Sequence, residues 1–180
     1  GSREVSTLNF GAYLQKLTED LLRCYNVGAS GINLRLEIEE NTFFDMDTAV
    51  PLGMVVNELV SNSLKHAFPD KKSGEIRIKL SREENRKFKN DKLKGKNEGR
   101  KCKNYTLTIS DNGTGIPESL NIEDSDTLGI QLVTILVDQL DGVLELNRNS
   151  GTEFIIEFSV EEKQQETYQE PLESPETLLF

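Results

Sequence analysis

Apolar and polar positions along the chain follow two different periods, and the switches between them predict the order of the elements. Helical spacing of apolar residues occurs in three stretches: 7 to about 25, about 49 to 68, and 127–140. Alternation typical of a strand with one buried face is strict over 32–40 and recurs over 75–81 and 105–110. Residues 142–149 and 151–160 are predicted to form two more strands, joined in a hairpin around Asn149-Ser150-Gly151. The predicted order is helix, strand, helix, strand, strand, helix, strand, strand.

Residues near the ends of the first two helices match known start and stop signals. Thr7 and Asn9 are candidate caps of the first helix, because their side chains can accept a bond from a backbone N–H. Pro51 is expected near the first turn of the second helix and Pro69 just past its end.

Two predicted hairpins dominate the second half of the chain, which argues against a doubly wound parallel sheet. The pattern favours an α/β two-layer sandwich, with a mixed, largely antiparallel sheet covered on one face by helices. We expect a tag scar and linker over 1–6, because Gly1-Ser2 resembles a cloning scar, then one domain over 7–160. Residues 161–180 are acidic and are expected to be a disordered tail.

Composition narrows the possible functions. The 180 residues suffice for one domain with a core, and no apolar run reaches the roughly 20 residues that span a bilayer. The net charge of −10 argues against general nucleic-acid binding. Cys24 and Cys102 lie far apart without a CxxC pattern, so we expect a reducing, cytoplasmic setting. We expect no membrane contact by this domain, and the expectation leaves open a membrane anchor in the parent protein.

Charge is uneven along the chain. Residues 81–104 hold ten Lys or Arg and four Asp or Glu residues. Such a run predicts a solvated loop, and a docking patch for an acidic partner is the alternative.

The second helix carries the first candidate chemistry. One arc of it is apolar apart from a serine and is the expected core face: Leu52, Val55, Val56, Leu59, Val60 and Ser63. Glu58, Asn62, Lys65 and His66 fall on a neighbouring arc, with Glu58 and Asn62 one turn apart. Carboxylate and amide oxygens suit a hard cation such as magnesium, whereas an ordinary amphipathic helix would show the same polar side.

Three loops add to this pattern, each weak by itself. Residues 111–117, DNGTGIP, follow a predicted strand, and their two glycines allow close approach to a ligand. Residues 125–130 open the third helix, whose free N–H groups could face a phosphate. Residues 150–152 precede the last strand. Read singly, each is only a turn or a helix start.

Taken in order, the four features resemble the boxes of the superfamily of gyrase, Hsp90, histidine kinases and MutL, with its Bergerat-type ATP-binding fold. The N box is similar to residues 57–69, the two glycine boxes to 111–117 and 127–133, and the closing Gly-Thr element to 151–158. The stretch 51–69 is especially similar to the HWE-type and related histidine kinases. The resemblance spans roughly residues 10–160.

The resemblance implies roles for individual residues. Asn62 would bind Mg²⁺ that bridges the ATP phosphates, and Asp111 would accept from the adenine amine, with Thr152 beside it through water. The other implied nucleotide contacts are Lys65, His66, Gly113, Gly115, Ile116, Thr127, Leu128 and Gly129.

Glu58 is the candidate catalytic residue, as a base or as an orienter of magnesium. The single histidine, His66, lies inside the N box, so the isolated chain is not expected to phosphorylate itself. The implied partners are a dimerisation domain that carries the phosphoacceptor histidine and the receiver domain of a response regulator.

Three other readings share the fold. One is an anti-sigma-factor-type serine kinase, which an upstream acceptor helix in the full gene would exclude. Another is a gyrase or MutL type ATPase, which needs a second domain that supplies a lysine. The last is a nucleotide-binding module without catalysis, which the intact Asp111 and Asn62 disfavour.

Overall fold

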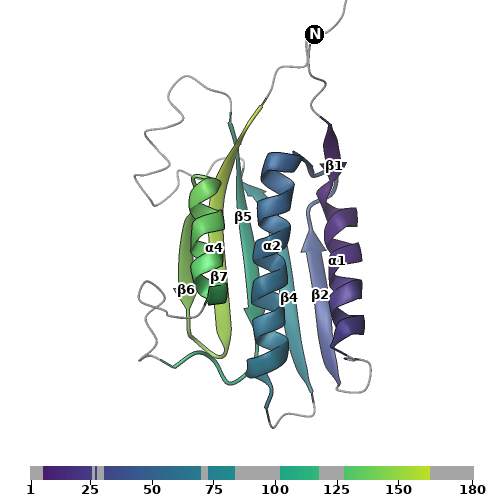
Figure 1. The fold of residues 1–180 in the computed structure, drawn as a ribbon, viewed down its shortest axis with the longest axis vertical. Coiled ribbons are helices and arrows are strands. Elements are labelled where there is room, and N and C mark those ends of the chain that lie inside the picture. The colour runs from purple at the N-terminus through teal and green to yellow at the C-terminus, as the bar shows by residue number, and fades with distance from the viewer. Residues whose placement is uncertain are drawn as a thin grey trace, which may run out of the picture.

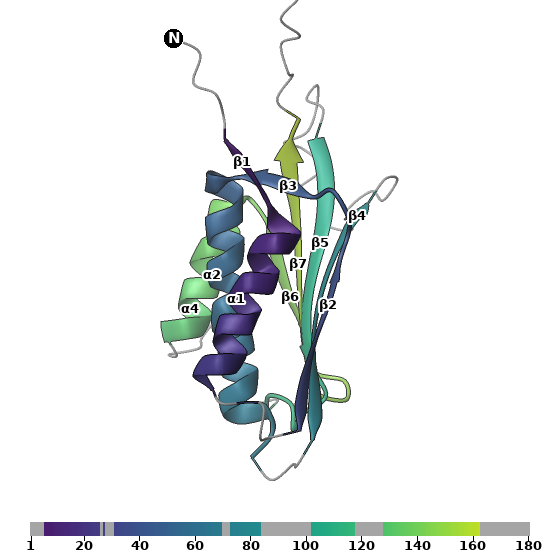
Figure 2. The ribbon, with the colours of Figure 1, turned by 90° about the vertical axis from the view of Figure 1, so that its right-hand side faces the viewer.

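A sheet and a layer of helices pack face to face in the computed structural model, which describes residues 6–25, 27, 31–69, 73–83, 102–117 and 128–162 (Figures 1 and 2). The helices lie side by side on one face of the sheet, with α2 between α1 and α4 (Figure 1). This arrangement confirms the predicted two-layer α/β sandwich.

Five strands form the main sheet, in the order β2 (Ile32–Ile38), β4 (Gly74–Glu83), β5 (Cys102–Asp111), β7 (Thr152–Glu161) and β6 (Val143–Asn147). The β2–β4 pair is parallel and the other three pairs are antiparallel. The mixed, largely antiparallel character is as predicted. Both predicted hairpins, β4–β5 and β6–β7, are present.

A second, two-stranded sheet was not predicted. It pairs β1 (Thr7–Asn9) with β3 (Phe43–Asp45) in antiparallel register. Each strand has three residues, which is too short for a period of two to stand out in the sequence. The assignment of Thr7 as a helix cap was wrong, because Thr7 lies in β1.

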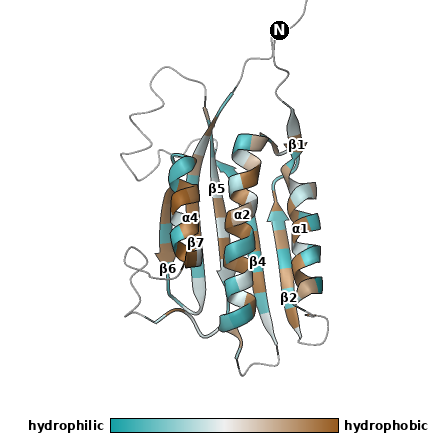
Figure 3. Ribbon diagram, in the orientation of Figure 1, coloured by the Kyte–Doolittle hydropathy of each residue, from teal (hydrophilic) through white to brown (hydrophobic). Residues whose placement is uncertain are grey.

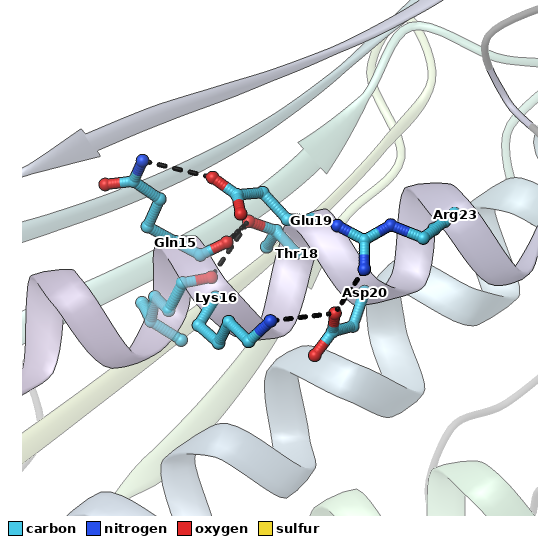
Figure 4. A network of polar contacts seen from close by, with 7 residues as sticks. Gln15, Lys16, Thr18, Glu19, Asp20 and Arg23 are labelled. Carbon is cyan, nitrogen blue, oxygen red and sulfur yellow. Dashed lines mark hydrogen bonds and ion pairs between the residues drawn. The ribbon is translucent and has the colours of Figure 1, made fainter.

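Helix α1 spans Phe10–Cys24, three residues later than its apolar pattern began. Asn9 is the cap, as predicted, and its Oδ1 accepts from the N–H of Ala12 at 3.0 Å. On the outer side of the helix, Asp20 accepts from Lys16 and from Arg23, each at 3.4 Å (Figure 4). These exposed pairs contribute little stability, because water screens them.

Helix α2 spans Met46–Asn62 and is followed by a π-helical turn, η2 (Ser63–Ala67). It begins three residues before the predicted start, because Asp45 caps it by accepting from the N–H of Thr48 at 3.1 Å. Pro51 therefore lies inside the helix and not in its first turn.

Helix α4 spans Leu128–Gln139. Its end is closed by a bond from the N–H of Gly142 to the carbonyl of Val137 at 2.9 Å. Asp141, with φ 52°, turns the chain from the helix towards β6.

The core lies between the two layers. Apolar residues alternate with polar ones along the strands (Figure 3), and every second residue in the middle of β4, β5 and β7 is buried in the core. All six positions predicted for the core face of α2 and η2 are buried: Leu52, Val55, Val56, Leu59, Val60 and Ser63. Among the described residues, no helix combines the length and the apolar character needed to span a membrane.

Candidate functional site

The four sequence features predicted to bind a ligand meet at one end of the molecule. The ends of α2 and β5 and the starts of α4 and β7 all lie at the lower end in Figure 1. Direct contacts join these elements.

Asp111 is the last residue of β5, and its side chain is buried between the sheet and η2, with 7% of its surface exposed. Its Oδ2 accepts from the Ser63 hydroxyl at 2.7 Å, and its Oδ1 accepts from the N–H of Gly113 at 2.9 Å. An ionised carboxylate has about four acceptor positions, so capacity remains for a ligand donor.

Thr152 lies directly beside Asp111, because the two residues are partners in the β5–β7 register. It is buried to the same degree, with 7% of its surface exposed. The preceding Gly151 has φ 121°, and a Cβ there would overlap the carbonyl oxygen of Asp111. A glycine is therefore required for β7 to start this close to the end of β5.

The loop after Asp111 is fixed against η2 and β4. The N–H of Thr114 donates to the carbonyl of Ala67 at 2.9 Å, and a Cβ at Gly113 would overlap that same carbonyl oxygen. On the other side, Asn112 Oδ1 accepts from the N–H of Glu75 at 2.8 Å. The first glycine box is thus anchored to the end of the N box.

Gly115 completes this loop close to the start of β7. It has φ 78°, and a Cβ there would lie 3.2 Å from the carbonyl oxygen of Gly151. Both glycines of the box therefore lie where backbone segments approach closely, as their spacing in the sequence indicated.

Glu58 and Asn62 are half-buried on α2 and face the start of α4. A Cβ added at Gly129 would lie 3.0 Å from Glu58 Oε2 and 3.9 Å from Asn62 Nδ2. The structure therefore brings together the helix-start glycine and the two polar residues predicted to act on phosphate and metal.

The remaining predicted residues lie around this centre with different degrees of exposure. Lys65 and His66 are exposed on η2, and Lys65 Nζ lies 5.9 Å from the centre of the Tyr25 ring, in a cation–π contact. Ile116 is half-buried against the core, whereas Leu128 is exposed. Thr127 lies outside the described residues.

Ser63 is the site residue that the sequence did not reveal. Its position on the apolar arc of α2 assigned it to the core, and it is indeed buried. Its bond to Asp111 crosses 48 positions of the sequence. The signal in the sequence was a hydroxyl on an otherwise apolar arc. A buried hydroxyl needs a hydrogen-bond partner, so its position indicated a polar neighbour.

The donor set suits magnesium better than softer metals. Within the described ranges, no three His, Cys, Asp or Glu side chains gather into a metal site. Glu58 and Asn62 offer a carboxylate and an amide, and Mg²⁺ favours a few such oxygens together with substrate phosphates. The residues therefore fit a metal ion that arrives with a nucleotide.

A separate hollow at the β6 edge contains none of the predicted residues. It is lined by residues 145–149 and by Ile155. Its lining comes from β6, the turn after it and the middle of β7, and it includes neither Asp111 nor its neighbours. We therefore place the site at the end of β5.

Comparisons with known proteins agree with this arrangement. A family model described as histidine kinase-, DNA gyrase B-, and HSP90-like ATPase matches residues 47–162. Blue-light-activated histidine kinase 2 of Erythrobacter litoralis is 27% identical over 157 residues, which are 87% of this chain and 39% of that protein. Sensor histidine kinase PdtaS of Mycobacterium tuberculosis is 32% identical over 120 residues, which are 64% of this chain and 20% of that protein.

The fold is also found among solved structures. The histidine kinase domain of the Erythrobacter litoralis EL346 blue-light activated histidine kinase superposes with a TM-score of 0.70 at 24% identity, over 88% of this chain and 65% of that one. The chain spans less than half the length of both curated relatives. Because the family model covers more than half of the chain, the chain belongs to the histidine kinase-, DNA gyrase B- and HSP90-like ATPase family.

Proposed function

We propose that this chain is the ATP-binding catalytic domain of a sensor histidine kinase, extending over residues 7–160. The domain would transfer the γ-phosphoryl group of ATP to a histidine on a separate dimerisation domain. The observation that carries the proposal is the buried Asp111 carboxylate, bonded on both oxygens and next to Thr152, where the N box, the first glycine box and the Gly-Thr element meet. Family membership and the named relatives, which are histidine kinases, support the same function.

Recognition of the base would rest on Asp111. Its carboxylate is acceptor-only when ionised, so it pairs with the exocyclic amine of adenine and not with a carbonyl oxygen. Thr152 would assist through a water molecule. Gly113, Gly115 and Ile116 would form the wall against the base, because the glycine loop is held against Ala67 and Gly151.

Recognition of the phosphates would rest on the start of α4 and the end of α2. Gly129, with Thr127 and Leu128 before it, would present backbone N–H groups at a helix N-terminus, which favours anions. Lys65 and His66 are exposed on η2, where their side chains could reach phosphate or ribose.

Asn62 would hold the metal ion, and Glu58 would act on the transfer. Mg²⁺ neutralises charge on the transferring phosphoryl group when bound. Glu58 is one turn from Asn62 and faces Gly129, so its carboxylate can orient the metal or accept a proton. Replacement of Glu58 by Gln in the complete kinase is expected to lower phosphotransfer strongly with little change in ATP affinity. Unchanged phosphotransfer would exclude this role.

The partners would be the dimerisation domain that presents the acceptor histidine and the receiver domain of a response regulator. Phosphoryl transfer requires the acceptor to lie in line with the transferred phosphoryl group. His66 lies on a short π-helical turn beside the site, and that turn does not present it in line. The isolated chain is therefore expected to bind ATP without phosphorylating itself.

The test is calorimetric titration of the chain with ADP and a non-hydrolysable ATP analogue, with and without Mg²⁺. We expect binding that is strengthened by Mg²⁺. We expect it to be lost in Asp111→Asn, because the neutral amide replaces one of the two acceptor oxygens by an NH₂ donor, which opposes the adenine amine. Absence of binding by the folded, unmutated chain would exclude the proposed function.

A further inference from the structure

A small polar cluster interrupts the apolar interior at the end of β5. Ser63, Asp111 and Thr152 are buried with 9%, 7% and 7% of their surfaces exposed. They come from three elements, η2, β5 and β7, so their meeting is a product of the fold. Buried polar groups need partners, and the Ser63 hydroxyl supplies one of the two described bonds to the Asp111 side chain.

The Ser63 hydroxyl departs from the usual behaviour of helical hydroxyls. In this protein Thr18 donates to the carbonyl of Leu14 at 2.8 Å, and Thr134 donates to that of Ile130 at 3.1 Å, both one turn back on their own helices. Ser63 instead donates across the interior to Asp111. It stands at the first position of the π-helical turn, a distortion that is frequent at functional sites.

The two bonds to Asp111 hold its carboxylate from the protein side. Ser63 donates to Oδ2 and the N–H of Gly113 donates to Oδ1, so rotation of the carboxylate would break at least one bond. The remaining lone pairs of both oxygens stay available to a ligand. A preorganised acceptor of this kind discriminates between ligands better than a mobile one, because binding does not have to fix its orientation at a cost in free energy.

We propose that Ser63 is a positioning residue that orients the Asp111 carboxylate and thereby sets the preference for a purine with an amine at position 6. The inference rests on the proposed nucleotide-binding function. A purine with hydrogen at that position cannot donate to the carboxylate, and one with a carbonyl there faces it with a second acceptor. Without the Ser63 hydroxyl the carboxylate can rotate, and the difference between these bases shrinks.

The experiment measures the affinity of the full chain for ADP and for the diphosphate of purine riboside, which carries hydrogen at position 6. Ser63→Ala is expected to weaken ADP binding about 10-fold to 100-fold, the range for a hydrogen bond to a charged group. Binding of the analogue is expected to change much less, so the ratio of the two affinities falls. Ser63→Thr keeps the hydroxyl and is expected to restore most of the ratio.

Ser61→Ala is the matched control. Ser61 is a second buried serine, two residues earlier at the end of α2, with 7% of its surface exposed. Its replacement removes one buried hydroxyl without removing the bond to Asp111, so the affinity ratio should not change. Thermal unfolding of each variant separates loss of the fold from loss of recognition.

Three outcomes would overturn the proposal. If Ser63→Ala weakens both nucleotides equally, Ser63 has only a structural role. If the unmutated chain binds ADP and Asp111→Asn does not, but Ser63→Ala keeps the full affinity ratio, the positioning role fails while the nucleotide-binding function stands. If the unmutated chain binds no ADP, both fail together.

Discussion

At the scale of single residues, the site depends on positions that cannot carry a side chain. Gly151 has both a left-handed backbone conformation and a neighbouring carbonyl oxygen where its Cβ would lie. Gly129 does not have a left-handed backbone conformation, and the atom nearest to its Cβ position is the flexible end of the Glu58 side chain. Gly151 is therefore required by the fold, whereas the proposed role of Gly129 is towards the ligand.

Gly151→Ala is expected to lower the free energy of unfolding by about 2 kcal/mol or more, because it combines backbone strain with overlap against Asp111. Urea denaturation measures the change. Gly11→Ala is the matched control: its Cβ would make ordinary contacts, the nearest at 3.4 Å, within a helix. That variant should be neutral or slightly more stable, by up to about 1 kcal/mol. Equal effects of the two replacements would contradict this explanation.

Gly129→Ala is expected to change stability by less than about 1 kcal/mol, since Glu58 can move and alanine favours helix. The added methyl group would nevertheless occupy the space between α4 and the pair Glu58 and Asn62. We therefore expect a loss of ATP affinity of about 10-fold or more, measured by calorimetry. Unchanged affinity would mean that the nucleotide phosphates do not approach this helix start.

At the scale of elements, side-chain caps determine where the helices begin. Helices α1 and α2 begin directly after their caps, Asn9 and Asp45, and not at the positions that the apolar spacing indicated. Asp45 has a particular effect, because it starts α2 early enough to place Pro51 inside the helix. The register of Glu58, Asn62 and Ser63 along the helix follows from periodicity and does not depend on that start.

Asp45→Ala is expected to lower the free energy of unfolding by about 1 kcal/mol, because the N–H of Thr48 loses its side-chain acceptor. Asp45→Asn should retain most of the stability, since its side-chain oxygen can accept the same bond. Asp47→Ala is the control: Asp47 is also acidic and in the first turn, but it is exposed and is not the cap. Its replacement should change stability by less than about 0.5 kcal/mol, and an equal loss would indicate a general charge effect.

At the scale of the whole molecule, an aromatic cluster joins the small sheet to the large one. Tyr105 on β5 stacks on Phe158 of β7, with ring centres 5.6 Å apart, and meets the Phe44 ring edge-on at 5.0 Å. Phe44 belongs to β3 and also contacts Phe10 of α1. Burial raises the pKa of Tyr105, because the phenolate would be poorly solvated there.

This raised pKa predicts a loss of stability at alkaline pH. The unfolded chain releases the tyrosine proton near pH 10, whereas the folded chain keeps it to a higher pH. The stabilising contribution is therefore complete below about pH 10 and is lost as the pH rises through the folded-state pKa. Tyr105→Phe should be less dependent on pH in this range, as measured by urea denaturation. The exposed Tyr25→Phe should keep the dependence, and an identical curve for Tyr105→Phe would contradict the prediction.

Much of the fold could be predicted from the chain because its elements carry strong local signals. Alternation along residues 32–38 and helical spacing in α2 reflect the burial of one face, which the structure shows. The order of the boxes led to the family, which the comparisons confirm. The roles of Asp111, Asn62 and Glu58 stay predictions, although the structure brings their elements together as expected.

The parts that were missed depend on contacts between distant residues. The sequence by itself determined the type and order of the long elements and the position of each box, since periodicity and turn residues act over a few neighbours. Only the tertiary structure decided that β2 pairs with β4 in parallel, that β1 and β3 form a small sheet, and that Ser63 turns to Asp111. The physical reason is that these pairings gain their free energy from packing across the whole core, and no local pattern encodes which distant partner satisfies a buried polar group.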